Sequence, residues 1–291
     1  MLLRALLSGG IAVAIAVGGG SARSGSVRVP GFVLDRPLSA AGTVWRGHIP
    51  GADAPSGPGE SFVYLPAHFS AARRFPVVYL LHGLPGTPRQ YVQGFHLARV
   101  ADRLIAVGAS PFIAVVPYAG PSARRGLAEW AGRWEDYLVD DVLPWVDANL
   151  PAASGASGRV LAGLSAGGFG ALDIGLRHPY LFGTLESWSG YFAPLRDGPF
   201  VHATAADLAA HDPALIVRRE ARLLRRLGTR FELSTGAAHG RITPSLTSGF
   251  AAELRALRLP LSVWHVPRGV RGPGYALQLQ HGLAYALRRS A

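Results

Sequence analysis

The chain has 291 residues, of which 49% are hydrophobic and 16% are charged, so it is not a disordered protein and is long enough for one large domain or two small ones. It contains no cysteine, which excludes disulfides, zinc–thiolate sites and a cysteine nucleophile. The formal net charge is +11 and all 29 basic residues are arginine, a bias typical of GC-rich codon usage; attraction to an anionic envelope or membrane surface is the functional alternative.

Nucleic acid is not an expected partner. The arginines are scattered along the chain, and no zinc-finger, RNP or basic aromatic motif accompanies them. One cluster, at residues 218–230, also has leucines at helical spacing. This pattern predicts an amphipathic helix with a solvated basic face.

Residues 1–25 have the pattern of a signal peptide or an N-terminal anchor. Arg4 precedes a mostly apolar run at residues 5–17, and the small residues after it would allow cleavage after Ala22. The run is short for a membrane span, which favours a cleaved signal over an uncleaved anchor. Either form predicts export, to the medium or the cell envelope. Residues 26–291 are then expected to form a single domain.

Strand and helix patterns alternate along this domain. Near-continuous apolar runs of a few residues predict strands buried on both faces, and longer segments with helical periodicity lie between them. The expected strands are 42–50, 61–66, 75–83, 111–119, 158–165, 182–190, 230–236 and 261–267. The expected helices are 91–108, 134–150, 166–179, 218–230, 245–259 and 277–289, with an irregular insertion over the sheet edge at 191–212. This order predicts an α/β fold with a mostly parallel, doubly wound sheet flanked by helices.

Residues 163–167 have the sequence Gly-Leu-Ser-Ala-Gly and lie between a predicted buried strand and a predicted helix. A G-x-S-x-G pattern in this context is typical of a nucleophile elbow, a sharp turn that exposes a serine hydroxyl. We therefore expect Ser165 to be a nucleophile. The helix that begins at Ala166 directs its amino end toward the serine, which favours developing negative charge.

An oxyanion hole needs two backbone N–H donors. One is expected from Ala166, directly after the nucleophile. The other is expected from Leu84, in the loop at residues 82–87, whose glycines allow the backbone to approach a ligand. His82 in the same loop has no visible partner in the sequence and is interpreted as a structural residue that braces the loop.

Three blocks of sequence carry a family resemblance. YLPAHFSAARRFPVVYLLHGLPGT, WEDYLVDDVLPWVDANL and LAGLSAGGFGALDIGLRHPYLFGTLESWSG agree in order and spacing, and they resemble the putative-esterase family of α/β-hydrolases, which includes esterase D-like enzymes and mycobacterial mycolyltransferase antigens. The resemblance covers residues 42–287. It implies an α/β-hydrolase fold, hydrolysis or transfer of carboxylic esters, and the roles above for Ser165, Leu84 and Ala166.

The resemblance fails at two positions. The chain order in this fold is Ser, then acid, then His, and the family acid stands in a pattern like G-x-x-D, where this chain has His239. The family histidine precedes the closing helix, where this chain has Gly274 or Tyr275. The usual acid and base of the triad are therefore expected to be missing.

Other residues could replace them. His239, expected at the carboxyl end of a strand, is interpreted either as an unorthodox base or as the vacated acid slot. Asp197 is a candidate for a relocated acid. His265 and His281 are expected to be packed or surface residues, and Glu186 lies in mid-strand, where burial would require a partner.

The remaining acidic residues of the 134–150 segment are interpreted as structural or helix-face charges; they are Glu135, Asp136, Asp140 and Asp141. No pair of histidines has metal-ligand spacing, so we expect no metal and no cofactor.

Two functions remain. The first is an exported serine esterase or acyltransferase that acts on a small-molecule ester or acyl-lipid substrate. The second is a non-catalytic α/β-hydrolase-fold protein that binds an envelope lipid, glycan or protein. The retained elbow favours the first and the double departure from the triad favours the second. The sequence does not indicate the oligomeric state.

Overall fold

The structure, a computed structural model, describes residues 28–35, 41–52, 59–120, 129–236, 242–268, 270 and 274–288. The predicted signal or anchor segment lies outside these ranges, and so does His239. Within them, no helix has both the length and the apolar character needed to cross a membrane.

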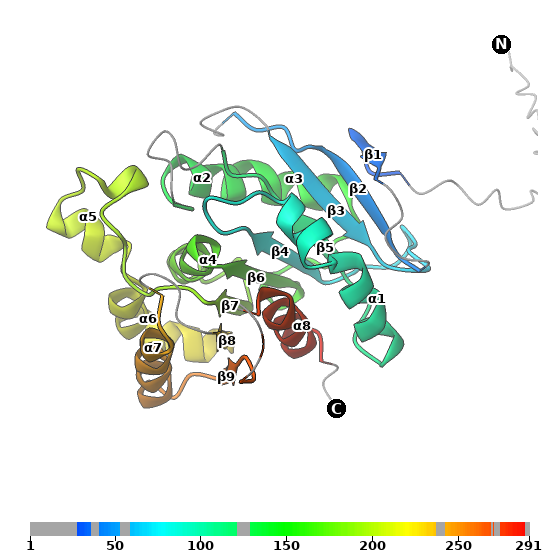
Figure 1. Cartoon of the computed structure of the whole chain (residues 1–291). Coiled ribbons are helices and arrows are strands. Elements are labelled where there is room, and N and C mark those ends of the chain that lie inside the picture. Colours follow the sequence, from blue (N-terminus) through cyan, green and yellow to red (C-terminus); the bar gives the residue numbers. More distant parts are fainter. Residues whose placement is uncertain are drawn as a thin grey trace, which may run out of the picture.

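A nine-stranded sheet forms the centre of the molecule (Figure 1). Its strands are β1 (Phe32–Leu34), β2 (Thr43–His48), β3 (Glu60–Leu65), β4 (Val77–Leu81), β5 (Ile113–Val116), β6 (Arg159–Leu164), β7 (Thr184–Trp188), β8 (Arg230–Thr235) and β9 (Leu261–His265). The spatial order is β1-β2-β3-β5-β4-β6-β7-β8-β9. Strands β1, β2, β3 and β5 pair antiparallel, and every pairing from β5 to β9 is parallel.

Helices cover both faces of the sheet, as Figure 1 shows. On one face lie α1 (Leu97–Ala106) and α8 (Tyr275–Ala286), which pack on alternate side chains such as Val78 and Leu80. On the other face, Val77 and Tyr79 pack against a second group of helices. That group comprises α2 (Arg133–Asp136), the π-helical η2 (Tyr137–Val142), α3 (Leu143–Asn149), α4 (Ala166–Arg177), α6 (Pro213–Leu227) and α7 (Pro244–Ala256). The mostly parallel, doubly wound α/β sheet is thus confirmed.

The insertion at residues 191–212 is more regular than its sequence pattern suggests. It contains a 3₁₀ turn, η4 (Gly198–Phe200), and a short helix, α5 (Ala205–Ala210). No residue of α5 is buried, but a capping box closes its first turn: Thr204 and Asp207 exchange side-chain and backbone hydrogen bonds. Capping thus stabilises a helix that has no apolar stripe.

The parallel strands bring their carboxyl ends to one edge of the sheet. The loop that follows β4 begins at His82, Ser165 follows β6, Ser189 follows β7 and Gly236 follows β8. Ligands of open α/β sheets bind at this edge. The predicted site residues therefore lie at the edge where a site is expected.

Candidate active site

Ser165 forms the junction between β6 and α4. Its backbone has φ 56° and ψ −117°, a conformation that a residue with a side chain seldom adopts. Its N–H donates a hydrogen bond to the carbonyl of Trp188, and the N–H groups of Gly168 and Phe169 bond to its own carbonyl. The predicted elbow is confirmed as a sharp strand-to-helix turn with the serine at its apex.

The two glycines of the motif allow this turn to fit against the sheet. A Cβ on Gly163 would lie 2.1 Å from the carbonyl oxygen of Gly167, and a Cβ on Gly167 would lie 2.0 Å from that of Leu81. Both distances are far below van der Waals contact. The glycines are therefore required by close backbone approach.

The loop after β4 lies against the elbow. A Cβ on Gly83 would lie 3.3 Å from the Cβ of Ser165, and Leu84, Ser165 and Ala166 line the same cavity. This places the two residues predicted to form the oxyanion hole beside the serine. Their roles as N–H donors stay a prediction.

His82 holds this loop in place. The residue is fully buried; one ring nitrogen, Nδ1, contacts the carbonyl of Gly83 at 3.0 Å and the other, Nε2, accepts the N–H of Ala119 at 3.1 Å. Burial lowers the pKa of His82 to about 4, against the effect of the Gly83 hydrogen bond. With both nitrogens engaged and the ring neutral, His82 has the structural role expected of it.

A cavity of about 950 Å³ opens at Ser165. Its wall is mainly apolar, with contributions from the insertion, α6 and α7: Leu84, Pro85, Phe192, Leu195, Ala214, Ile242, Leu246 and Phe250. Three carboxylic acids, Glu129, Asp197 and Glu253, also line it, as do Arg196 and Arg218. The site thus combines a hydroxyl in a strained turn with a space of ligand size.

Glu129 is the residue of this cavity that the sequence analysis did not identify. It is 1% exposed, and its Oε1 accepts a hydrogen bond from the Tyr191 hydroxyl. Burial raises the pKa of Glu129 to about 9, although the Tyr191 hydrogen bond opposes the shift; the charge of Asp197 adds to it. The sequence held one signal, a lone acid between Ala128 and Trp130. Asp197, the candidate relocated acid, does lie in this cavity.

Among the described residues, no histidine lines the Ser165 cavity. His239, the candidate base, lies outside the described residues and stays a prediction. His265 is exposed at the end of the edge strand β9, and His281 is packed in α8, where it stacks on Trp264 at 4.7 Å. These positions agree with the interpretation of His265 and His281 as packed or surface residues.

The position of the family histidine coincides with the start of α8. Gly274 has φ 65°, and a Cβ there would lie 2.6 Å from Val266 Cγ1. Tyr275 is the first residue of the helix and packs edge-on against Phe95. The left-handed conformation and the contact with Val266 explain why Gly274 is a glycine rather than a histidine.

A pair of buried glutamates lies between the sheet and α8. Glu186 of β7 and Glu232 of β8 are paired in register and are at most 1% exposed. Glu186 accepts the indole N–H of Trp188 at 3.1 Å, and Nδ1 of His281 lies 3.1 Å from Glu232 Oε1. The partner that Glu186 was expected to require is therefore Trp188.

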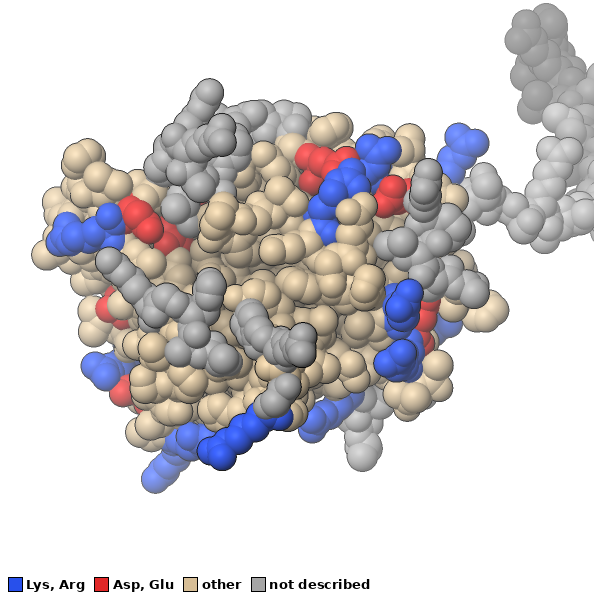
Figure 2. Space-filling view, viewed as in Figure 1, with Lys and Arg blue, Asp and Glu red and all other residues tan. Residues whose placement is uncertain are grey.

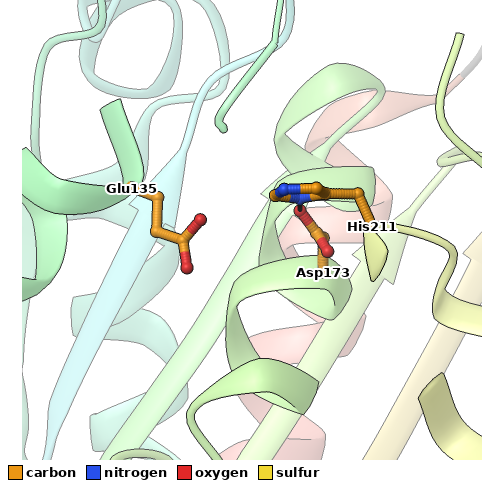
Figure 3. A group of neighbouring side chains, drawn as sticks. All are labelled: Glu135, Asp173 and His211. Carbon is orange, nitrogen blue, oxygen red and sulfur yellow. Dashed lines mark hydrogen bonds and ion pairs between the residues drawn. The ribbon is translucent and has the colours of Figure 1, made fainter. Parts of the chain in front are cut away.

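A second cluster contains Glu135, Asp173 and His211, whose potential ligand atoms lie within 4.8 Å of one another. In Figure 3, the ring of His211 lies over Asp173 and Glu135 faces them across a gap. The Nη1 of Arg177 contacts both Glu135 and His211. Arg177 pairs with Glu135, and His211 pairs with Asp173 at 2.7 Å, so these side chains form a network of ion pairs and hydrogen bonds.

The acidic residues of segment 134–150 include both kinds of charge expected of them, structural and helix-face. Asp136 and Asp140 are exposed, as expected of helix-face charges, but Glu135 is 4% exposed. Burial would raise the pKa of Glu135, yet the hydrogen bond from His178 and the charge of Arg177 lower it overall. Glu135 is therefore an ionised, paired structural residue.

Known proteins resemble this chain in sequence and in fold. The model of a family described as "Putative esterase" matches residues 56–249. An esterase of Mycobacterium tuberculosis is 31% identical over 150 residues, which are 50% of this chain and 32% of the relative. The chain therefore spans about a third of the length of this curated relative.

Two solved structures share the fold. A ferulic acid esterase superposes with a TM-score of 0.73 at 20% identity, covering 85% of this chain and 98% of that one. A fluorophosphonate-binding serine hydrolase of Staphylococcus aureus superposes with a TM-score of 0.69 at 15% identity, covering 86% and 100%. At these identities the likeness concerns the α/β-hydrolase fold.

Proposed function

The chain belongs to the esterase family, and from this premise we propose that it is a serine hydrolase that cleaves or transfers carboxylic esters with Ser165 as its nucleophile. The observation that carries the proposal is the strained turn that presents Ser165 to an apolar cavity. Strain of this kind persists where the surrounding structure imposes it, and it is common at catalytic residues.

The proposed reaction has two steps. Ser165 Oγ attacks the ester carbonyl, its proton passes to a base and then to the departing alcohol, and an acyl-serine remains. Water or a second alcohol then releases the acyl group. The N–H groups of Leu84 and Ala166 would stabilise the oxyanion of each step, and the amino end of α4 would favour the same charge.

Two forms of the proposal follow, and they differ in whether the chain has a base for Ser165. In the first, His239 accepts the serine proton; the support is that β8, the strand before it in the chain, ends at the same edge of the sheet as Ser165. In the second, the chain has no working base and is a non-catalytic binding protein. The observation that favours the second is that no described histidine lines the cavity.

Reaction with a fluorophosphonate separates the two forms. Labelling of Ser165 at the rate of an ordinary serine esterase, absent in Ser165→Ala and strongly slowed in His239→Ala, would support the enzyme with His239 as base. His265→Ala is the matched control, because this histidine is exposed on the edge strand.

The opposite result would support the binding protein. Labelling would be slow, and turnover of an activated ester would change little in Ser165→Ala, since a serine without a base contributes little. A residual acceleration of roughly 10³–10⁴ over water can remain in a site stripped of its triad. Residual turnover that does not depend on Ser165 would therefore not support the proposed serine hydrolase.

We further propose export through residues 1–25, to the medium or the envelope, where the net charge of +11 would favour an anionic surface. The support is the signal-like pattern of residues 1–25. Expression of the full chain and of residues 26–291 tests this: only the full chain should leave the cytoplasm. Mass spectrometry of the exported protein distinguishes cleavage after Ala22 from a retained anchor.

A further inference from the structure

One part of the wall of the Ser165 cavity is formed by Glu129, Tyr191 and Asp197, which contact one another through Glu129. Tyr191 is held in place by stacking on Phe169, with ring centroids 5.1 Å apart. Its hydroxyl donates to Glu129 Oε1, so the glutamate side chain is fixed in direction. This part of the wall is therefore built from two segments far apart in sequence.

Two carboxyl groups in this part of the wall, Glu129 and Asp197, are hydrogen-bond neighbours of each other. Their buried oxygens Glu129 Oε2 and Asp197 Oδ1 accept no hydrogen bond from any other group within the part of the chain that the structure describes. One proton shared by two carboxyl groups leaves acceptor positions of both groups unfilled, and an unfilled buried acceptor is unfavourable. A bound group that donates hydrogen bonds would offset this cost.

The charges around these oxygens favour a neutral group. Burial raises the pKa of Glu129 to about 9, against the Tyr191 hydrogen bond, and the charges of Asp197 and Asp173 add to the shift. Glu129 is therefore protonated at neutral pH and can both donate and accept.

The basic residues of the same wall argue against a cationic ligand. Arg196 and Arg218 line the cavity, and Arg218 pairs with Glu253 at 2.8 Å. A cation would gain the attraction of Asp197 but would meet these guanidinium groups. Hydroxyl groups, which donate and accept, match a protonated acid beside a carboxylate.

We propose that Glu129 and Asp197 form a specificity subsite that binds hydroxyl groups on the alcohol portion of the ester. The apolar wall, including Leu195, Leu246 and Phe250, takes the acyl chain. The inference rests on the proposed esterase function and narrows its substrate class to apolar acyl esters of polyhydroxyl alcohols. It gives Glu129 a role in substrate recognition that does not depend on which base serves Ser165.

A matched pair of substrates tests the subsite. Glyceryl monobutyrate and propyl butyrate share an acyl group and a three-carbon alcohol and differ by two hydroxyl groups. We expect wild-type protein to prefer the glyceryl ester by about 10-fold in kcat/KM, the discrimination that about one buried hydrogen bond to a substrate hydroxyl supplies. The ratio of the two esters cancels any general loss of activity in a variant.

Substitutions then assign the preference to the subsite. Glu129→Leu should reduce the ratio to near one, whereas Glu129→Gln, which keeps a neutral donor and acceptor, should keep it within about threefold. Asp197→Asn is a second variant at a less buried position and should lower the ratio in part. Glu220→Gln, at a surface ion pair with Arg219, is the control and should leave the ratio unchanged.

Two results would overturn the proposal: a wild-type ratio near one, or a ratio that Glu129→Leu leaves intact. A loss in Glu129→Gln equal to that in Glu129→Leu would also contradict it, because a charged ligand would then be indicated.

The esterase proposal fails separately, if wild-type protein cleaves neither ester. Binding of the two esters to Ser165→Ala by calorimetry then decides the subsite on its own. Tighter binding of the glyceryl ester, lost in Ser165→Ala with Glu129→Leu, supports it; equal binding of the two esters rejects it.

Discussion

At the residue scale, the sharp turn at Ser165 depends on two neighbouring glycines that have no side chain. Ser165 adopts a conformation that costs of order 1–3 kcal/mol, and the turn fits only because Gly163 and Gly167 carry no side chain. The hydroxyl position is therefore set by backbone packing against β4 rather than by the serine's own side-chain contacts. Small changes in that packing should affect reactivity before they unfold the protein.

The change Gly167→Ala tests this dependence. Its Cβ would lie 2.0 Å from the carbonyl oxygen of Leu81, so we expect a loss of stability of about 1–3 kcal/mol, as for overpacking. We also expect a fall in the rate of fluorophosphonate labelling that is larger than the loss of folded protein. Thermal unfolding and labelling rates measure the two effects.

Gly249→Ala is the matched control. Gly249 lies in α7, lines the same cavity, and has no atom within 4 Å of its would-be Cβ. Alanine in a helix interior should stabilise the protein by about 0.5–1 kcal/mol. Equal effects of the two alanines on labelling would show that the close approach at Gly167 does not set the geometry of Ser165.

At the scale of elements, two buried acidic side chains lie where α8 packs against the sheet. Glu186 and Glu232 lie on neighbouring strands beneath α8, and Gly282 of that helix approaches so closely that a Cβ there would lie 2.3 Å from Glu186 Oε2. Burial raises the pKa of both groups well above the usual range, and for Glu186 the charge of Glu232 adds to the shift. Two adjacent buried carboxyls cannot both ionise at low cost.

The pair predicts a pH dependence of stability with a defined sign. Because both pKa values are raised in the folded state, the stabilisation is fully present below the unfolded pKa of about 4.3 and is lost as pH rises toward the folded values. Glu232→Gln should remove part of this loss. Its melting temperature should exceed that of wild type by a margin that grows from pH 5 to pH 8, with a gain of about 1–2 kcal/mol at pH 8.

The surface variant Glu220→Gln is the control for this measurement and should follow the wild-type profile at every pH. The amide oxygen introduced by Glu232→Gln would still accept from His281, so the contact with α8 is kept. A margin that shrinks as pH rises would contradict the raised pKa values.

Several elements could be predicted from the sequence and others could not, for identifiable reasons. The buried parallel strands and the amphipathic α6 have strong periodicity, and they form, although α6 spans Pro213–Leu227 and not the expected 218–230. Strand β1 was missed because two of its three residues, Val33 and Leu34, are exposed and it pairs only with β2. Helix α5 has no buried residue, and only its capping box could have revealed it.

The candidate site likewise contains a residue that the sequence predicts and one that it does not. Ser165 was predictable because the elbow motif is local in sequence. Glu129 was not, because its significance comes from Tyr191, which is 62 residues away, and from a burial that no local pattern records. Residues that act through tertiary contacts of this kind can be identified only once the strands have brought their loops together.

At the scale of the whole molecule, the positive charge is spread over the surface and partly neutralised. Arginines pair with carboxylates on many elements, including Arg46 with Glu60, Arg159 with Asp147 and Arg218 with Glu253. On the face seen in Figure 2, the basic side chains lie apart around the margin, with acidic groups among them. Among the described residues, such a distribution favours a weak general attraction to anions over one concentrated site for nucleic acid.

This distribution predicts how the protein responds to duplex DNA. At physiological salt we expect no sub-micromolar binding, because non-specific affinities there are typically about 10⁻⁴–10⁻⁶ M. At low salt, weak binding should appear, measured by fluorescence anisotropy.

Two double variants test whether the charge is scattered. They remove the same charge from exposed residues of different helices: Arg99→Glu with Arg103→Glu on α1, and Arg222→Glu with Arg226→Glu on α6. Scattered charge requires that both weaken low-salt binding equally, within about twofold, because only the total charge then matters. If one pair abolishes binding and the other has no effect, the charge forms a localised site and the exclusion of nucleic acid is wrong.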